Sequence, residues 1–231
     1  MTEQHVLPRI EQDSMNRSEV EAVIHSYGLP VCFAGVDFSN QDMTRLDLSG
    51  CHFERCLMQE AEFTGSTLEC CVFRSCRGGM ANFRSTKLAE AQFINSDFNN
   101  SQWQHAKLNQ ASFTGCKLTG ANFTQVAALG MTFSDTLLIG AYLPGFSFYK
   151  TEIDNLDLSD ADLSDADFRH AVFVGGSLAN ARVNGARFDN ADLRDTSLQG
   201  LKLTDAKLFK GSIISRAQAG MLLAGLGLTV A

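Results

Sequence analysis

Large apolar side chains recur at every fifth position of this chain. From Phe38 to Ile213 these positions number 36, and only Gly78 and Ala128 lack a large apolar side chain. A period of five fits neither a helix, with 3.6 residues per turn, nor a strand, with two. The pattern therefore predicts a tandem repeat whose register continues unbroken to Ile213.

Each repeat unit combines one large and one small inward position. The residue two before the large one is usually small, as at Ala61 and Ala81, and the residue directly before it is usually polar, as at Asp162. This composition predicts a narrow coil packed along its axis, with the other three residues facing water. At Gly78, where the large side chain is missing, we expect a bulge or a narrowing of the coil.

A second period, of twenty residues, is superimposed on the first. Phenylalanine recurs at this interval along one column, which only Ile153 interrupts. The predicted core column consists of Phe53, Phe73, Phe93, Phe113, Phe133 and Phe173. We expect residues twenty apart to stack in adjacent coils, about 4.8 Å from one another.

Short stretches such as Ala-Asp-Leu-Ser-Asp at 161–165 and Ala-Asn-Phe-Thr-Gln at 121–125 resemble the pentapeptide-repeat family. The resemblance covers about residues 33–213. It implies an all-β solenoid, namely a right-handed quadrilateral β-helix of about nine 20-residue coils, with short capping helices at both ends.

The two ends of the repeat are predicted to carry these caps, because a solenoid exposes an unfinished core at each end. Residues 1–30 form an N-terminal tail and capping helix, 31–213 the β-helix, and 214–231 a C-terminal helix and tail. Ser18 to Glu21 is a predicted capping box, and the helix ends at Gly28, with residues 1–15 poorly ordered. Ser215 to Gln218 is a second box, which opens a helix through Ala224 followed by a strand over 226–230.

The C-terminal segment also resembles the end of Qnr-type quinolone-resistance proteins, as does the segment 121–133. That resemblance implies a homodimer formed end to end, although the segment is equally explained as a cap alone. The implied interface residues are Gln218, Met221, Leu222, Leu223, Leu226, Leu228 and Val230. Many Qnr-type proteins carry loops inserted between coils, and the unbroken register here leaves no such loop.

Net charge and hydropathy bear on whether the protein binds nucleic acid and on where in the cell it is located. The net charge of −7 disfavours direct binding of nucleic acid, which requires a basic surface. No apolar run is long enough for a membrane span, and the N-terminus lacks the pattern of a secretion signal. We therefore expect a cytoplasmic protein without membrane contact.

The residues capable of chemistry form no recognisable catalytic set. Five of the seven cysteines occupy small inward positions, so we predict reduced core side chains rather than disulfides or ligands. The five histidines are scattered without metal or triad spacing. We predict no catalytic residue, no cofactor and no metal, and hence a protein that is not an enzyme.

One surface segment is strongly acidic. It comprises Glu152, Asp154, Asp157, Asp160, Asp162, Asp165 and Asp167, with no basic residue among them. We refer to these seven residues as the acidic belt. An aspartate before the large inward position is also ordinary repeat chemistry, because its side chain solvates the surface and bonds nearby backbone.

The Qnr resemblance gives the acidic belt a functional interpretation. It implies a DNA-mimicking rod that binds DNA gyrase or topoisomerase IV and protects the enzyme from quinolones or a natural poison. The alternative is a scaffold, regulator or effector that binds some other protein.

Overall fold

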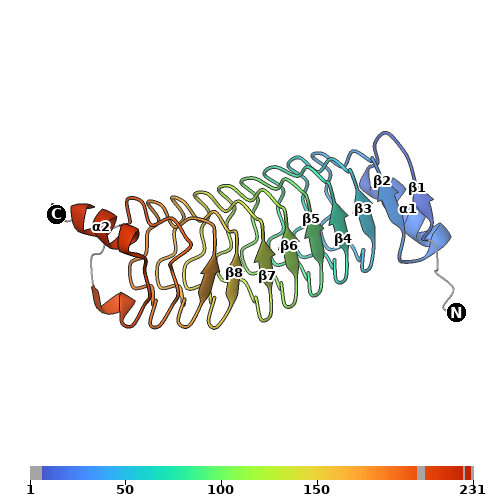
Figure 1. Ribbon diagram of the computed structural model, residues 1–231. Helices are drawn as coiled ribbons and strands as arrows, with labels where there is room; N and C mark the ends of the chain where they lie inside the picture. The colour runs from blue at the N-terminus through green and yellow to red at the C-terminus, as the bar shows by residue number, and fades with distance from the viewer. Residues whose placement is uncertain (1–6, 202–205, 226, 230–231) are drawn as a thin grey trace, which may run out of the picture. The chain divides into compact units, whose positions relative to one another are not determined.

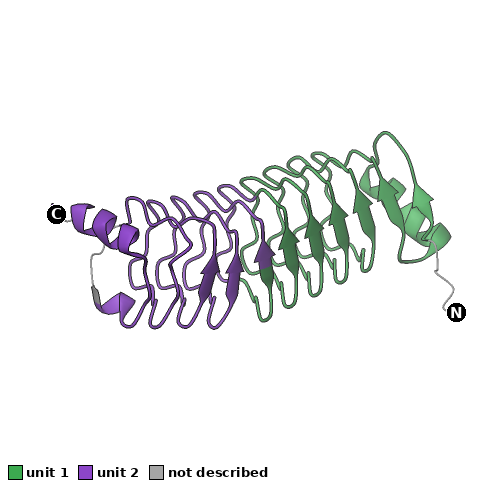
Figure 2. Ribbon diagram, in the orientation of Figure 1, with its two compact units in different colours: residues 1–117, 126–132 green, residues 118–125, 133–231 purple. Residues whose placement is uncertain are grey.

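The computed structural model describes residues 7–201, 206–225 and 227–229. The chain forms two compact units, which Figure 2 shows in different colours. Unit 1 consists of Met1–Lys117 and Val126–Thr132, and unit 2 of Leu118–Gln125 and Phe133–Ala231.

Short parallel strands form one side of the coils (Figure 1). They are β1 (Arg9–Ile10), β2 (Cys32–Ala34), β3 (His52–Glu54), β4 (Val72–Arg74), β5 (Gln92–Ile94), β6 (Ser112–Thr114), β7 (Thr132–Ser134), β8 (Glu152–Asp154) and β9 (Val172–Val174). From β2 to β6 in unit 1 and from β8 to β9 in unit 2, residues pair with residues twenty positions further on, as Phe53 does with Phe73. Isolated parallel bridges, nearly all with the same spacing, form the other three sides. The fold is the expected right-handed quadrilateral β-helix, with about eight turns where about nine were expected.

The corners of the coils explain why the repeat has five residues. Nearly every fifth residue from Gly35 to Gly200 has a positive φ, for example 71° at Gly50 and 57° at Asn100. A type II turn requires this conformation, and glycine and asparagine adopt it at the lowest cost. Behind Gly50, the turn is closed by a hydrogen bond from the Cys51 N–H to the Leu48 carbonyl, at 3.1 Å.

The predicted inward columns form the core of each unit. Phe53, Phe73, Phe93 and Phe113 are fully buried in unit 1, and their rings stack at 4.5–4.8 Å. In unit 2, Phe133 and Phe173 are buried as well, at 7% and 2% exposure. All six phenylalanines of the predicted core column are therefore buried.

The cysteines at small inward positions are buried and free, as predicted. Four of these thiols donate a hydrogen bond to a backbone carbonyl of the preceding coil. Cys76 donates to Phe53 at 3.2 Å, for example, and Cys71 to Leu48 at 3.0 Å. Burial raises the pKa of Cys116 to about 11. The Cys116 thiol is therefore protonated, and the five buried cysteines at these positions fill the core.

Gly78 produces no bulge, because its N–H bonds the Asp97 carbonyl at 2.7 Å and its carbonyl accepts from the Ala81 N–H at 3.1 Å, as in the regular coils. A Cβ at this position would collide with the ring of Phe98 in the next coil and lie 3.3 Å from Met58 of the coil before. The Phe98 ring thus fills the space that a large side chain at Gly78 would take. The missing side chain is compensated by its neighbour in the column.

The predicted register is wrong in the last coil. Up to Asn180, backbone N–H groups bond the carbonyl nineteen residues later, whereas Phe188 bonds Leu208 and Leu193 bonds Ile213, each twenty residues later. The ring that stacks on Phe188, at 4.7 Å, belongs to Phe209. One additional residue therefore lies in this coil, where the chain forms the short 3-10 helix η1 (Ala206–Phe209). As a result Ile213, predicted to point inward, is 49% exposed.

The N-terminal cap is helix α1 (Arg17–Tyr27), and its capping box differs from the predicted one. The N-cap is Asn16, whose side chain accepts from the Glu19 N–H at 3.1 Å, while the Glu19 carboxylate accepts from the Asn16 N–H at 2.7 Å. Ser18 lies inside the first turn because the helix begins one residue before it. Val20 is buried against the apolar end of the first coil, whereas Tyr27 is 61% exposed.

Residues 7–16, which precede α1, are more ordered than predicted. β1 pairs with β2, so that Ile10 lies beside Phe33. Arg9 pairs with Glu54 at 2.7 Å, which ties the segment to a third strand.

The C-terminal cap is helix α2 (Arg216–Gly225), with the predicted capping box. The Ser215 N–H donates to the Gln218 side chain at 2.6 Å, and the Gln218 N–H donates to the Ser215 hydroxyl at 3.2 Å. The predicted strand over 226–230 is absent from the described residues 227–229, where Leu228 instead bonds back to Leu223.

Candidate partner-binding surface

The acidic belt occupies one coil of unit 2. The carboxylates directly before a large inward residue lie on four different sides of that coil, each beside a residue of the next coil. These neighbours are Glu152 with Val172, Asp157 with Ser177, Asp162 with Arg182, and Asp167 with Arg187. The placement predicted from the repeat is therefore present.

Three of these carboxylates bond the backbone of their own turn. Asp157 accepts from the N–H of Ser159 at 3.0 Å, and Asp162 from that of Ser164 at 3.1 Å. Asp167 makes the same bond two residues on. Aspartates outside the belt do likewise, at Asp37, Asp42, Asp47, Asp97 and Asp192. The ordinary repeat interpretation thus accounts for three members of the belt.

Two of the same carboxylates are also neutralised by arginines. Asp167 pairs with Arg169 at 2.6 Å, and hydrogen bonds from that guanidinium hold the pKa of Asp167 below its ordinary value. Asp162 pairs with Arg182 at 3.2 Å. Burial disfavours the charged form of Asp162, but hydrogen bonds from Ser164 and the charge of Arg182 together lower its pKa. Both stay ionised, and their charge is largely compensated.

The remaining carboxylates are more accessible. Glu152, Asp160 and Asp165 are exposed and have no side-chain partner in the part of the chain that the structure describes. Asp160 and Asp165 sit at corners, with φ of 57° and 61°. Asp154 accepts from the Ser134 hydroxyl at 2.7 Å. Only three of the seven acidic side chains are therefore fully available to a partner.

The predicted dimer segment also contains both buried and exposed residues. Gln218 and Leu222 are buried, at 7% and 8% exposure, so these two residues belong to the cap and not to an interface. The Gln218 amide donates to the carbonyls of the last coil. Met221, Leu223 and Leu228 are 38%, 38% and 56% exposed. Leu226 and Val230 lie outside the described residues.

Sequence reasoning missed two exposed apolar residues beside this segment. Ile213 and Ile214 are 49% and 37% exposed, because the additional residue in the last coil turns this stretch outward. The sequence did contain one sign of the additional residue, namely Phe209, an aromatic residue one position beyond the predicted inward position 208.

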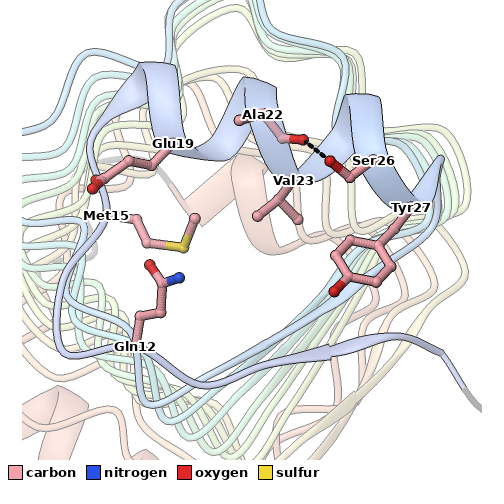
Figure 3. A pocket seen from close by; sticks show the side chains of 7 residues that line it. All are labelled: Gln12, Met15, Glu19, Ala22, Val23, Ser26 and Tyr27. Atoms are coloured by element: carbon pink, nitrogen blue, oxygen red, sulfur yellow. Dashed lines mark hydrogen bonds between the residues drawn. The ribbon is translucent and has the colours of Figure 1, made fainter.

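A shallow pocket lies under helix α1 in unit 1 (Figure 3), with a volume of about 250 Å³. It is lined by Gln12, Met15, Glu19, Ala22, Val23, Ser26 and Tyr27. The Glu19 carboxylate is engaged in the capping box, and the Ser26 hydroxyl donates to the Ala22 carbonyl at 2.8 Å. Since these polar groups already have partners, we do not assign a ligand to this pocket.

No group of three or more metal-ligating side chains occurs within the described residues. In that same part of the chain, no helix has both the length and the apolar character that a bilayer span requires.

Comparison with protein families agrees with the coil geometry. A family described as pentapeptide repeat region matches residues 46–123, and one described as pentapeptide repeats (8 copies) matches 133–169 and 171–208. The chain belongs to the pentapeptide-repeat family. Pentapeptide-repeat proteins are generally structural or scaffold proteins without enzymatic activity.

Solved structures of other pentapeptide-repeat proteins share the fold. A trypsin-treated variant of QnrB1, a plasmid-mediated fluoroquinolone resistance protein, is 19% identical with a TM-score of 0.56, covering 84% of this chain and 97% of its own. Full-length QnrB1 is 18% identical with a TM-score of 0.52, covering 97% and 99%. HetL, a protein involved in heterocyst differentiation regulation in a Nostoc cyanobacterium, is 18% identical with a TM-score of 0.50, covering 86% and 94%.

A search of curated proteins found no match to this pentapeptide-repeat chain. At these identities the solved structures establish a common fold and not a common function.

Proposed function

We propose that this pentapeptide-repeat protein binds a type II topoisomerase, DNA gyrase or topoisomerase IV, in the cytoplasm. It would protect the enzyme from quinolones or from a natural topoisomerase poison. The observation that carries this proposal is the likeness to QnrB1 over nearly the full length of both chains. The protein acts through its surface and catalyses no reaction.

Exposed carboxylates supply the attraction. A topoisomerase grips the phosphates of DNA with basic side chains, so carboxylates on a coiled β-helix compete for the same positions. Glu152, Asp160 and Asp165 are the exposed carboxylates of the acidic belt that have no side-chain partner within the described residues. They lie on a single coil of unit 2, which makes this coil the proposed contact.

Neutralising these three carboxylates tests the contact in a supercoiling assay with gyrase and ciprofloxacin. We expect the wild-type protein to restore supercoiling, and a Glu152→Gln, Asp160→Asn, Asp165→Asn variant to need about tenfold more protein. Each exposed charge pair contributes roughly 0.2–1 kcal/mol, and about 1.4 kcal/mol is tenfold in affinity.

The matched control changes three exposed carboxylates of unit 1, as Glu60→Gln, Glu69→Gln and Glu90→Gln, with the same change in net charge. This variant should protect as well as the wild type. Absence of rescue by the wild-type protein at any ratio would contradict the function. Equal loss in both variants would show that only the total charge matters.

We also propose that two copies associate through the exposed side chains of the C-terminal segment. Met221 and Leu228 present apolar surface beyond the buried cap residues. A Met221→Glu, Leu228→Glu variant should be a monomer by light scattering, since like charges placed in an apolar contact oppose association. The control is Leu129→Glu, which changes an 83% exposed leucine of unit 1 and should leave the dimer intact. A monomeric wild-type protein, or a variant that remains dimeric, would refute the interface.

The second candidate function is a scaffold or regulator whose partner is not a topoisomerase. HetL, described as involved in heterocyst differentiation regulation, shares the fold at a similar level of likeness. Affinity capture from a lysate of the host separates the two functions, because a topoisomerase among the captured proteins supports protection and its absence supports the alternative.

A further inference from the structure

A polar groove of about 450 Å³ runs along one corner of three successive coils in unit 1. It is lined by Ser75, Cys76, Arg77, Asn95, Ser96, Asp97, Gly115 and Lys117. The volume is within the range of small-molecule sites, about 300–1,000 Å³. None of these residues belongs to the acidic belt or to the C-terminal segment.

Two cations flank the groove without a partner. Arg77 and Lys117 are exposed, and neither side chain has an ion pair or hydrogen bond within the described residues. Arg77 pairs with Asp97 of the next coil, and Asp97 pairs with Lys117 of the coil after that. At normal strand spacing the backbones of Arg77 and Lys117 are therefore about 10 Å apart. An unpaired arginine is well suited to a phosphate, because its planar fork binds two oxygens at once.

The surrounding corner is also basic. Arg55 lies one coil before the groove and Arg74 directly beside Ser75, and both are exposed and unpaired among the described residues. The nearby Glu54 is already paired with Arg9 at 2.7 Å. This corner is therefore positive in a chain of net charge −7, and it draws anions toward the groove.

The small inward residues behind the groove are hydrogen-bonded within the core. The Cys76 N–H donates to the Ser96 hydroxyl at 3.0 Å, and the Ser96 backbone N–H donates to the Cys116 thiol of the next coil. The donors that this groove offers to a ligand are therefore side chains.

The side chains opposite the cations complete a mixed donor and acceptor set. The Ser75 hydroxyl and Asn95 amide line the wall, and Gly115 leaves room for Asn95, because a Cβ there would collide with the Asn95 amide oxygen. Asp97 accepts from the Asn99 N–H at 3.2 Å through one oxygen, and its other oxygen is an acceptor for a hydroxyl.

We infer that this groove binds a small phosphorylated molecule that carries hydroxyl groups, such as a sugar phosphate or a nucleotide. Arg77 and Lys117 hold the phosphate oxygens, with help from the Ser75 hydroxyl. Asp97 accepts from a sugar hydroxyl and disfavours an anion without one.

Calorimetric titration of the full chain with ribose 5-phosphate, ADP, inorganic phosphate and citrate tests this site. We expect ribose 5-phosphate or ADP to bind with a dissociation constant on the order of 0.1 mM, and citrate to bind much more weakly. Arg77→Gln and Lys117→Gln should each weaken binding about tenfold, as loss of a charge-assisted hydrogen bond does. Asp97→Asn should reduce the advantage of ribose 5-phosphate over inorganic phosphate.

The matched controls are Arg84→Gln and Lys87→Gln, which remove exposed cations from another side of the same unit. Both should bind ribose 5-phosphate as the wild type does, and all variants should keep the wild-type melting temperature. Three results would overturn the assignment: no saturable binding up to about 10 mM, equal affinity in Arg77→Gln and the wild type, or citrate or an acidic peptide binding as tightly as the phosphates. None of these results depends on gyrase protection.

Discussion

Replacing Phe93 with alanine should lower the free energy of unfolding by about 3–5 kcal/mol. The ring is fully buried and stacks at 4.5 Å on both Phe73 and Phe113. It also meets Phe98 and Trp103 edge to face, at 5.5 Å and 5.3 Å. Backbone hydrogen bonds hold the coils on either side at a fixed spacing, so the cavity cannot close.

Denaturant unfolding followed by circular dichroism measures this loss. Gln92→Ala is the matched control, because Gln92 lies next to Phe93 on β5 with its side chain exposed. That variant should stay within about 0.5 kcal/mol of the wild type. A loss below about 1.5 kcal/mol for Phe93→Ala would mean that the column relaxes into the space.

Replacing Gln218 with alanine should lower the free energy of unfolding by about 2–4 kcal/mol. Its amide nitrogen donates to the carbonyls of Leu193 and Thr196, at 2.6 Å and 2.7 Å, and its oxygen accepts from the Ser215 N–H. Each buried group left without a partner costs about 1–3 kcal/mol, and loss of a cap costs about 1 kcal/mol. Gln218 is therefore the residue that attaches α2 to the end of the last coil.

Two further variants separate the donor role of Gln218 from its shape. Gln218→Glu keeps the size but cannot donate, so it should destabilise at least as much as the alanine variant. Ser215→Ala removes only the hydroxyl half of the capping box and should cost about 0.5–2 kcal/mol. Thermal and denaturant unfolding of the three variants give the order, and a larger loss for Ser215→Ala than for Gln218→Ala would contradict the proposed attachment.

The interior of the coils could be derived from sequence because the determinants are local. A corner at every fifth residue places the large and the small side chain inward, and twenty residues bring the chain back to the same side. The column from Phe53 to Phe113 follows from those two facts. The register beyond Phe188 could not be derived, because Phe209 and Leu208 are both large and apolar. Stacking on the Phe188 ring selects Phe209.

The candidate surface was only partly predictable, since charge alone does not tell whether a side chain is available. Asp162 and Asp160 have the same side chain, yet one bonds Ser164 and Arg182 while the other has no side-chain partner within the described residues. Gln218 likewise sits in a segment that looks like an interface and is buried against its own coil. These differences depend on which residue of the neighbouring coil lies within reach.

By itself, the sequence of this protein determined a four-sided coil and its inward columns, because both arise from short periods repeated along the chain. It also determined the capping helices, because their capping residues and helical pattern lie within one short segment each. The tertiary structure decided the additional residue in the last coil, the three available carboxylates of the acidic belt and the basic groove at Arg77 and Lys117. These features arise where successive coils meet, and the contacts there join residues about twenty positions apart that no single five-residue unit contains.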